Sequence, residues 1–111
     1  MHELAISEAI VSEVCERVGD TSVVRVVLEI GRLSGVVPDA VRFCFDLAAR
    51  STVLEGAALE IMEIPGLARC RSCQAPVALG DCHIGTCAGC GSVDLDVVGG
   101  QELRIKCVEV M

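Results

Sequence analysis

The sequence predicts an α+β fold, in which two helices pack on a small mixed β-sheet and a cysteine-rich module is inserted before the last strand. Three observations predict it: two stretches with a helical apolar stripe, three stretches with strand-like alternation, and a glycine-rich stretch with two Cys-x-x-Cys pairs. A chain of 111 residues can bury one modest core with a small module attached. Because there is no Trp or Tyr, that core must consist mainly of Val, Ile, Leu and Ala.

The first two elements follow from apolar periodicity. Residues 4–18 place their apolar side chains on one stripe, which predicts an amphipathic helix, and Gly19-Asp20 ends it. Residues 22–30 alternate and are rich in valine, which predicts a strand. We expect one face of this strand to be its inner face, formed by Val24, Val26, Leu28 and Ile30.

Two further strands and a second helix complete the predicted core. Residues 31–35 form a loop, and Pro38 suits the first turn of a helix that runs to about Arg50. Residues 57–64 and 102–110 alternate like strands. We expect the last strand to return to the sheet begun by the first one, because a sheet covered by two helices is the simplest way to bury these stripes.

The cysteine pairs predict a metal site. Cys70-x-x-Cys73 is followed after thirteen residues by Cys87-x-x-Cys90. Each pair brings two sulfurs onto one tight turn, and two facing turns match the tetrahedral geometry of Zn²⁺ at roughly 2.3 Å per bond. Gly91 suits the second turn, where φ > 0 is expected. A metal is favoured over two redox dithiols. Since all four ligands come from the protein, we predict a structural zinc in a zinc-ribbon-like module.

The sequence therefore predicts two domains. Residues 1–66 together with 100–111 form the α+β domain, and residues 67–99 form the zinc-binding module. Apolar periodicity in 67–99 is too weak to predict a core of its own, so metal binding is expected to supply the folding energy of this module.

The remaining cysteines and one histidine have less specific predictions. Cys15, Cys44 and Cys107 stand on predicted helices or on the last strand, where a free cysteine packs as a small apolar side chain. Cys82 and His83 lie between the two pairs and are expected to be loop residues. Competition for the metal, or a charge switch at His83 near neutral pH, stays open as an alternative.

Charge and composition exclude several classes of protein. A net charge of -7 with a single lysine opposes nucleic-acid binding. No apolar run approaches the roughly 20 residues of a membrane span, and the first ten residues contain two glutamates and no Lys or Arg, unlike a secretory signal peptide. Without an export signal, the eight cysteines are expected to be reduced, and we expect a cytoplasmic protein with no membrane partner.

The segment Met1-His2-Glu3 offers a second metal site. The free amine, the backbone amide of His2 and its imidazole can close two fused chelate rings and place three nitrogens around one ion, a set that favours Ni²⁺ or Cu²⁺ over Zn²⁺. Glu3 can complete the coordination through its amide or carboxylate. By itself a His at position 2 is more often a solvated terminal residue. A metalloprotease His-Glu-x-x-His helix is excluded, because its fifth position is Ile6.

Five stretches, in order along the whole chain, resemble the HypA/HybF family of hydrogenase maturation factors. They are Met1-His2-Glu3-Leu4, Ile30-Gly31-Arg32-Leu33-Ser34, the pairs Cys70-x-x-Cys73 and Cys87-x-x-Cys90, and the closing residues 100–110. The chain departs from many relatives at Ala88, where they have proline. Some relatives also have a carboxylate in the loop before the second helix, and Asp39 is not assigned to that role.

The resemblance implies a nickel metallochaperone that is not an enzyme. Its expected cargo is Ni(II), bound at the N-terminus by His2 with Glu3 beside it and delivered to the large subunit of [NiFe] hydrogenase with the help of a maturation GTPase. The implied structural Zn(II) is held by Cys70, Cys73, Cys87 and Cys90.

Three other classes remain open from the residues alone. A rubredoxin-like electron carrier would hold iron in the same four sulfurs, although the missing aromatic residues argue against it. A zinc-ribbon adaptor would bind protein partners without nickel transfer, and shares every feature except His2. A zinc-dependent enzyme needs an open coordination position, which a complete tetrathiolate lacks.

Overall fold

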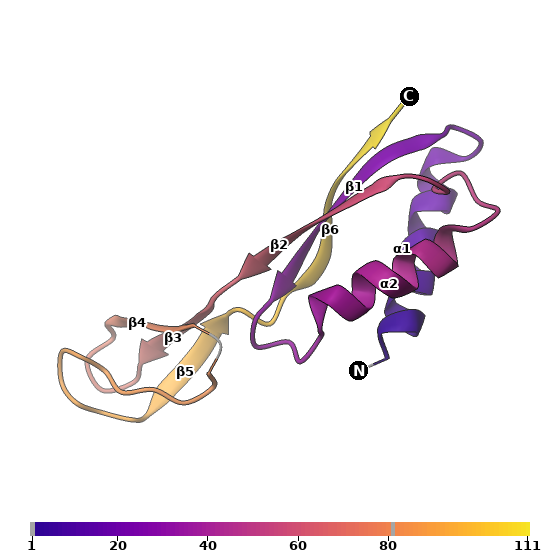
Figure 1. Cartoon of the computed structure of the whole chain (residues 1–111). Helices are drawn as coiled ribbons and strands as arrows, with labels where there is room; N and C mark the ends of the chain where they lie inside the picture. Colours follow the sequence, from indigo (N-terminus) through magenta and orange to yellow (C-terminus); the bar gives the residue numbers. More distant parts are fainter. Residues whose placement is uncertain (1, 81) are drawn as a thin grey trace. The chain divides into compact units, whose positions relative to one another are not determined.

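The computed structural model describes residues 2–80 and 82–111 and contains two helices and two three-stranded sheets (Figure 1). This confirms the predicted α+β class. The chain forms two compact units. Unit 1 comprises Met1–Glu29, Val36–Met62 and Arg104–Met111, and unit 2 comprises Ile30–Gly35 and Glu63–Leu103. The domain boundaries given above stay a prediction.

The first sheet has the strand order β2-β1-β6. Its strands and the two helices have these bounds: α1 (Glu3–Val18), β1 (Val23–Gly31), α2 (Pro38–Ala49), β2 (Ala58–Ile64) and β6 (Leu103–Val110). All five elements were predicted to within about one residue at each end. β1 and β2 run in the same direction and β6 runs opposite to them, so the sheet is mixed (Figure 1). The last strand returns to the first one, as predicted.

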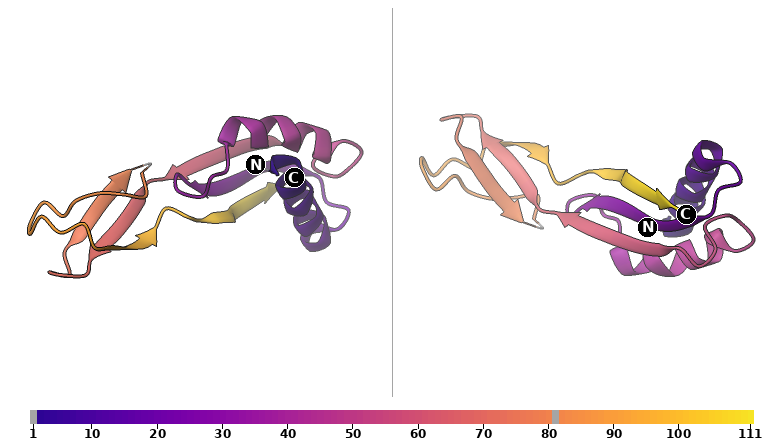
Figure 2. Two further views of the ribbon diagram at one scale, coloured as in Figure 1. Left: turned by 90° about the horizontal axis from the view of Figure 1, so that it is seen from below. Right: turned by 90° about the horizontal axis from the view of Figure 1, so that it is seen from above.

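Both helices lie on one face of this sheet (Figure 2). The helix α1 contributes its predicted stripe to the core, with Ile10, Val11 and Val14 buried. Ser7, which is fully buried, faces α2, and its hydroxyl donates to the carbonyl oxygen of Val41 at 3.4 Å. Because this side chain is small and its hydroxyl is hydrogen-bonded, the two helices can approach each other without burying an unpaired polar group.

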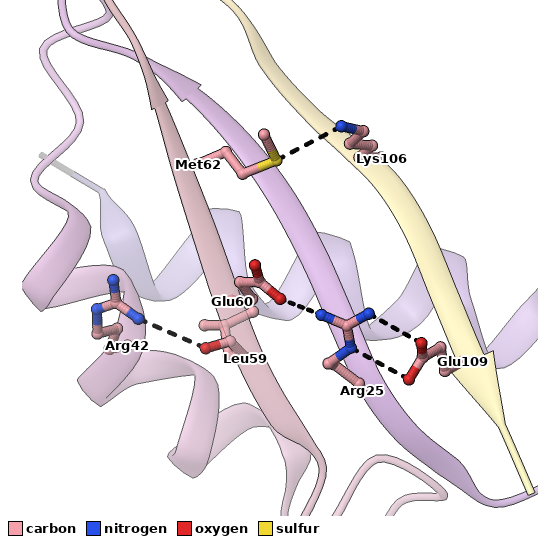
Figure 3. Close-up of polar contacts among 7 residues, drawn as sticks. All are labelled: Arg25, Arg42, Leu59, Glu60, Met62, Lys106 and Glu109. Carbon is pink, nitrogen blue, oxygen red and sulfur yellow. Dashed lines mark hydrogen bonds and ion pairs between the residues drawn. The ribbon is translucent and has the colours of Figure 1, made fainter.

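The prediction for the faces of β1 is correct only in part. Three of the expected inner residues are buried: Val26, Leu28 and Ile30. Val24 is 47 % exposed, whereas Val23 and Val27 on the other face are buried. Across that second face Lys106 Nζ donates to Met62 Sδ at 3.6 Å (Figure 3). Long side chains that extend over the central strand in this way cover apolar side chains there. The alternating pattern of the sequence alone would place those side chains in contact with solvent.

The same face carries an ionic network on its central strand. The guanidinium of Arg25 donates to Glu109 at 2.8 and 3.1 Å and pairs with Glu60 on the other side, so that all three strands are joined (Figure 3). The Arg104 Nε atom donates to Glu29 at 2.6 Å. The face opposite the helices therefore carries charged side chains beside the buried Val23 and Val27, and the charged side chains are those expected on the uncovered side of a sheet.

The second sheet lies in unit 2 and has the order β4-β3-β5, with both pairs antiparallel. Its strands are β3 (Gly66–Cys70), β4 (Pro76–Gly80) and β5 (Leu95–Gly99). The expectation that this module has no core of its own is wrong. A small cluster of buried residues lies here: Leu33, Ala68, Cys70, Val77, Leu79 and Cys87. Strands of five residues point too few side chains inward to show a period, which is why the sequence did not reveal the cluster.

Two further predictions concern the surface. Cys15 and Cys44 are partly buried, but Cys107 is exposed, because β6 is an edge strand of its sheet. The expectation of a packed Cys107 is therefore wrong. Neither helix in the described part of the chain is long and apolar enough to cross a membrane.

Candidate metal centre

The two cysteine pairs fold into turns of the same form. In the first turn the Gln74 N–H donates to the Cys70 carbonyl at 2.8 Å, and in the second the Gly91 N–H donates to the Cys87 carbonyl at 2.8 Å. The residue after each pair is left-handed, with φ 66° at Gln74 and 75° at Gly91. This confirms the turn predicted at Gly91, while Gln74 adopts the same conformation with a side chain. The repeated geometry aims two sulfurs of each turn in one direction.

The four sulfurs meet at distances that suit zinc. The Sγ atoms of Cys70 and Cys90 are 3.5 Å apart, and those of Cys73 and Cys87 are 3.6 Å apart. All four lie within 4.8 Å of one another. A tetrahedral zinc with bonds of about 2.3 Å separates its sulfur ligands by about 3.8 Å, so the cluster needs little adjustment to hold the ion.

Two of the sulfurs are prepared as thiolates by backbone donors. The pKa of the Cys70 thiol is lowered to about 6, chiefly by the N–H of Cys73. The pKa of Cys87 is also lowered, first by the N–H of Cys90 and then by that of Gly89. Hydrogen bonds to a thiolate favour the charged form, which is the form that binds metal.

The pKa values of the other two thiols are raised, because a second negative charge close to the first is unfavourable. At Cys73 the N–H of Ala75 lowers the pKa, but the sulfurs of Cys87 and Cys70 and the burial of the thiol raise it above its usual value. At Cys90 the N–H of Ser92 likewise lowers the pKa, but the sulfurs of the other three cysteines raise it to about 12. Four thiolates at this separation repel one another unless a cation lies between them. A divalent ion that prefers sulfur removes the repulsion, and among biological ions zinc fits both the donors and the geometry.

These observations indicate a structural zinc. Cys70 and Cys87 are buried in the core of unit 2, whereas Cys73 and Cys90 are exposed. With four protein sulfurs the coordination is complete, so a zinc ion here cross-links the two turns and leaves no position for a substrate. Its contribution is folding energy for unit 2.

Polar contacts between the two turns were not predicted from the sequence. The Ser72 hydroxyl donates to that of Ser92 at 3.2 Å, and the Arg71 N–H donates to the carbonyl of Asp94 at 3.0 Å. The Arg71 guanidinium also lies 3.7 Å from the carboxylate of Asp94 and 3.6 Å from that of Asp96. These ion pairs are exposed and contribute little energy. They fix the register of the second turn against the first.

Cys82 and His83 lie outside the cluster. Both are exposed, and the Cys82 N–H donates to the carbonyl of Leu79 at 3.2 Å. Among residues 2–80 and 82–111, the metal-binding group consists of the four paired cysteines alone. The structure thus agrees with the expectation that Cys82 and His83 are loop residues.

His2 and Glu3 lie in unit 1, at the beginning of α1. His2 is exposed with φ 53°, and its carbonyl accepts the hydrogen bond from the Ile6 N–H at 3.0 Å. The Glu3 Oε2 atom accepts a hydrogen bond at 3.2 Å from the N–H of Val37, the residue directly before α2. The pKa of the Glu3 carboxyl is lowered, with the positively charged amino terminus as the largest cause and the Val37 N–H next. Met1, which carries the predicted amine ligand, is outside the described residues.

Comparison with known proteins places this chain in a family. Residues 1–110 match the family described as hydrogenase/urease nickel incorporation, metallochaperone, HypA. The chain belongs to the HypA family. It is 56 % identical over 110 residues to the hydrogenase maturation factor HypA of Nostoc sp., covering 99 % of this chain and 96 % of the relative. The protein of the same name from Geobacter metallireducens is 46 % identical over 111 residues and is covered to 99 %. The resemblance predicted from the sequence is confirmed.

Solved structures of HypA proteins share the fold. The solution structure of the Ni metallochaperone HypA from Helicobacter pylori superposes with a TM-score of 0.66 at 22 % identity, covering 100 % of this chain and 98 % of that one. A second HypA solution structure gives a TM-score of 0.65 at 21 % identity, with 97 % and 92 % covered. At these identities the likeness establishes the fold alone.

Proposed function

We propose that this chain binds Ni²⁺ at its N-terminus through His2 and Glu3 and delivers it during maturation of [NiFe] hydrogenase. Membership of a family described by nickel incorporation supports the class of function. The observation that carries the N-terminal site is the exposed imidazole of His2 directly before the first turn of α1. An imidazole at this point of the chain lies one residue from the terminal amine.

The position of α1 leaves the chelating backbone accessible. Hydrogen bonding within the helix begins with the Ile6 N–H donating to the His2 carbonyl. The amide nitrogen of His2 precedes this ladder, so metal binding there breaks no helical hydrogen bond. Amine, amide and imidazole nitrogens then form the planar set that Ni²⁺ prefers, and Glu3 completes it from the first residue of the helix.

Release follows from the same location. Ligands at a chain terminus can be removed one at a time without disturbing the buried core of unit 1. Because amine, amide and imidazole must all lose a proton to bind, protons compete with nickel, and affinity falls as the pH falls. The cycle is binding and transfer, so we propose no catalytic residues and no enzymatic activity.

The chemistry of the ligands decides which metal each site binds. We propose Cys70, Cys73, Cys87 and Cys90 as the ligands of a structural zinc, because thiolates retain Zn²⁺ in a closed tetrahedral site. Nitrogen donors at the terminus select nickel instead. In this view residues 1–66 with 100–111 form the nickel-binding domain, and residues 67–99 form the zinc-binding module.

The proposed partners are proteins. We propose a maturation GTPase of the same pathway and the hydrogenase large subunit, since relatives such as that of Nostoc sp. are named hydrogenase maturation factors. Net charge -7 opposes a nucleic-acid partner. We also propose a cytoplasmic location, where the cysteines would stay reduced and the four paired ones could hold zinc.

Nickel calorimetry on zinc-loaded protein without any N-terminal extension tests the proposal. We expect the His2→Ala variant to lose more than about tenfold in nickel affinity, and Glu3→Ala to lose less. The chain provides matched controls, because His83 is its second histidine and Glu8 is an exposed glutamate of the same helix. His83→Ala and Glu8→Ala should bind nickel like the wild type. Undiminished nickel binding by His2→Ala would overturn the N-terminal site. A wild-type protein that takes up no nickel would leave the zinc-ribbon adaptor as the function.

A further inference from the structure

The helix α2 carries apolar side chains on two opposite sides. One side is buried in the core of unit 1 and consists of Val41, Phe45 and Ala49. The other side, which we call the outer stripe, has residues three and four positions apart and is formed by Ala40, Phe43 and Leu47. On this stripe Phe43 is 69 % exposed and Leu47 is 40 % exposed.

The first helix shows that the fold does not require such an arrangement. The helix α1 packs against α2 and buries one apolar side. Its opposite side is polar, and the exposed residues there are Glu8, Ser12, Glu13 and Glu16. A helix that covers a core with one side ordinarily has polar residues on the other. The second apolar side of α2 is therefore typical of a surface that another molecule covers.

Phe43 has the most apolar surface of the three stripe residues. The chain has only two aromatic residues, and the fold buries the other one, Phe45, in its core. Aromatic side chains bury a large area and are enriched at the centres of protein interfaces. Leu47 lies one turn further along the helix and extends the surface that a partner would cover.

Charge indicates what kind of partner fits the outer stripe. The two helices carry six carboxylates and two arginines, a net charge of -4, which Arg50 at the C-cap of α2 reduces to -3. Asp39 precedes Phe43 by four residues and Asp46 follows it by three, so both carboxylates lie on the same flank of the ring. A partner that covers Phe43 should therefore place positive charge beside this flank.

The arginine next to Phe43 leaves both carboxylates accessible. Arg42 extends toward the sheet, where its Nη1 atom donates to the carbonyl oxygen of Leu59 in β2 at 3.4 Å (Figure 3). Its Nε atom lies 3.7 Å from the carboxylate of Asp39, whose side chain is nevertheless 97 % exposed. Such an exposed pair contributes little energy. A cation on a partner can therefore reach Asp39, and it can reach Asp46, which is also exposed.

We propose that the outer stripe of α2 is a docking surface for a basic amphipathic helix of a partner protein. Apolar side chains of that helix cover Phe43 and Leu47, and its lysines or arginines face Asp39 and Asp46. A second copy of this chain does not fit, because two acidic helix layers would face each other. The stripe contains none of the proposed metal ligands, so the proposal does not rest on nickel transfer.

Titration of the zinc-loaded full chain with synthetic peptides tests the proposal. The probe is a helical peptide of about 18 residues, with leucines at helical spacing and lysines on both flanks of the leucine stripe. We expect it to bind with a Kd on the order of 10–100 μM and to shift the amide NMR signals of residues 39–50. A matched peptide with glutamate in place of every lysine should not bind.

Substitutions in the protein locate the binding surface. We expect Phe43→Ala to weaken binding of the lysine peptide by about tenfold or more. Its circular dichroism should stay that of the wild type, because the ring lies outside the core. Leu67→Ala is the matched control, since it removes another exposed apolar side chain, on β3 of unit 2, and should bind like the wild type.

A pair of double variants separates local charge from net charge. Asp39→Asn with Asp46→Asn should weaken binding several-fold at low salt and make it less sensitive to added salt. Glu8→Gln with Glu16→Gln removes the same number of charges from the exposed side of α1 and should bind nearly like the wild type.

The remaining outcomes overturn the proposal. Wild-type protein that binds neither peptide, or both equally, has no basic docking surface, and equal binding by Phe43→Ala places the peptide elsewhere. Self-association of the wild type that is lost in Phe43→Ala would make a second copy the occupant. Shifts of the β3–β5 amide signals in Phe43→Ala without peptide would mean that unit 2 of the same chain covers the stripe.

Discussion

At the scale of single residues, burial decides which side chains the fold depends on. The chain has two phenylalanines, both on α2, and the structure treats them in opposite ways. Phe45 is 1 % exposed and packs in the core of unit 1, whereas Phe43 is 69 % exposed. Helical spacing explains the difference, since residues two positions apart lie on opposite faces.

The two phenylalanines make a matched pair for a stability measurement. We expect Phe45→Ala to lower the free energy of unfolding by about 3–5 kcal/mol, because it removes a buried ring and leaves a cavity. Phe43→Ala should change it by about 0.5 kcal/mol or less. Urea denaturation of zinc-saturated protein, followed by far-ultraviolet circular dichroism, provides the comparison. Similar losses in both variants would mean that Phe43 is covered in solution.

Residue positions could be predicted from sequence only where the chemistry is local. The four zinc-site cysteines follow from spacing, since each pair closes its own turn. Val27 and Leu33 could not be placed, because their burial depends on side chains or strands that lie far away in the sequence. The exposure of Cys107 depends likewise on β6 lying at the edge of its sheet.

At the scale of elements, the first sheet is joined on its exposed face by one arginine. Arg25 of β1 binds Glu60 of β2 and Glu109 of β6. Hydrogen bonds and charge from Arg25 lower the pKa of the Glu109 carboxyl. The folded state therefore holds this carboxylate ionised more strongly than the unfolded chain does.

The sign of the resulting pH dependence is fixed. A lowered pKa in the folded state adds stability above the usual carboxyl pKa, and that stability is lost as the pH falls through the lowered value. We expect Arg25→Gln to be less stable than the wild type near neutral pH and to lose less of its stability on acidification. Thermal denaturation at a series of pH values measures this. Arg17→Gln, which removes a single exposed pair with Glu13 at 3.6 Å, is the control and should follow the wild-type curve.

Elements were predictable in unit 1 and much less so in unit 2. Long periodic stretches such as α1 and β1 show their type directly in the sequence. The strands β3, β4 and β5 have five residues each, and Gly66, Gly80 and Gly99 stand at their ends. Strands this short are stable only because they pair with one another and lie beside the metal site. Neither kind of contact can be recognised from a local pattern in the sequence.

At the scale of the whole molecule, the two units draw their stability from different sources. Unit 1 has a core of apolar residues from two helices and a sheet, with Val26, Leu28 and Val41 fully buried. The small core of unit 2 contains two of the four zinc-site sulfurs. We therefore expect the folding of the second unit to depend on zinc and that of the first unit not to.

Chelation of zinc should consequently unfold one unit and spare most of the other. We expect amide protection in β3–β5 to disappear, while the helical circular dichroism of α1 and α2 largely remains. Acid should release the metal as well, because protons compete with zinc for the thiolates, including that of Cys70, whose pKa is lowered to about 6. Metal analysis after buffer exchange at falling pH follows this release.

Single substitutions give the matching control for the metal site. Cys73→Ser should lose zinc, and Cys82→Ser, which changes an exposed cysteine outside the cluster, should keep it. Retention of zinc by Cys73→Ser would show that a different set of ligands holds the ion.

The strand order β2-β1-β6 has a consequence for biosynthesis. Of the three strands in this sheet, the central strand β1 leaves the ribosome first and its neighbour β6 leaves it last. A nascent chain therefore carries β1 with one unpaired edge until β6 has emerged, and such an edge can pair with other chains. All four zinc-site cysteines emerge after β1 and before β6. Zinc can therefore bind before β6 pairs with β1 and completes the first sheet.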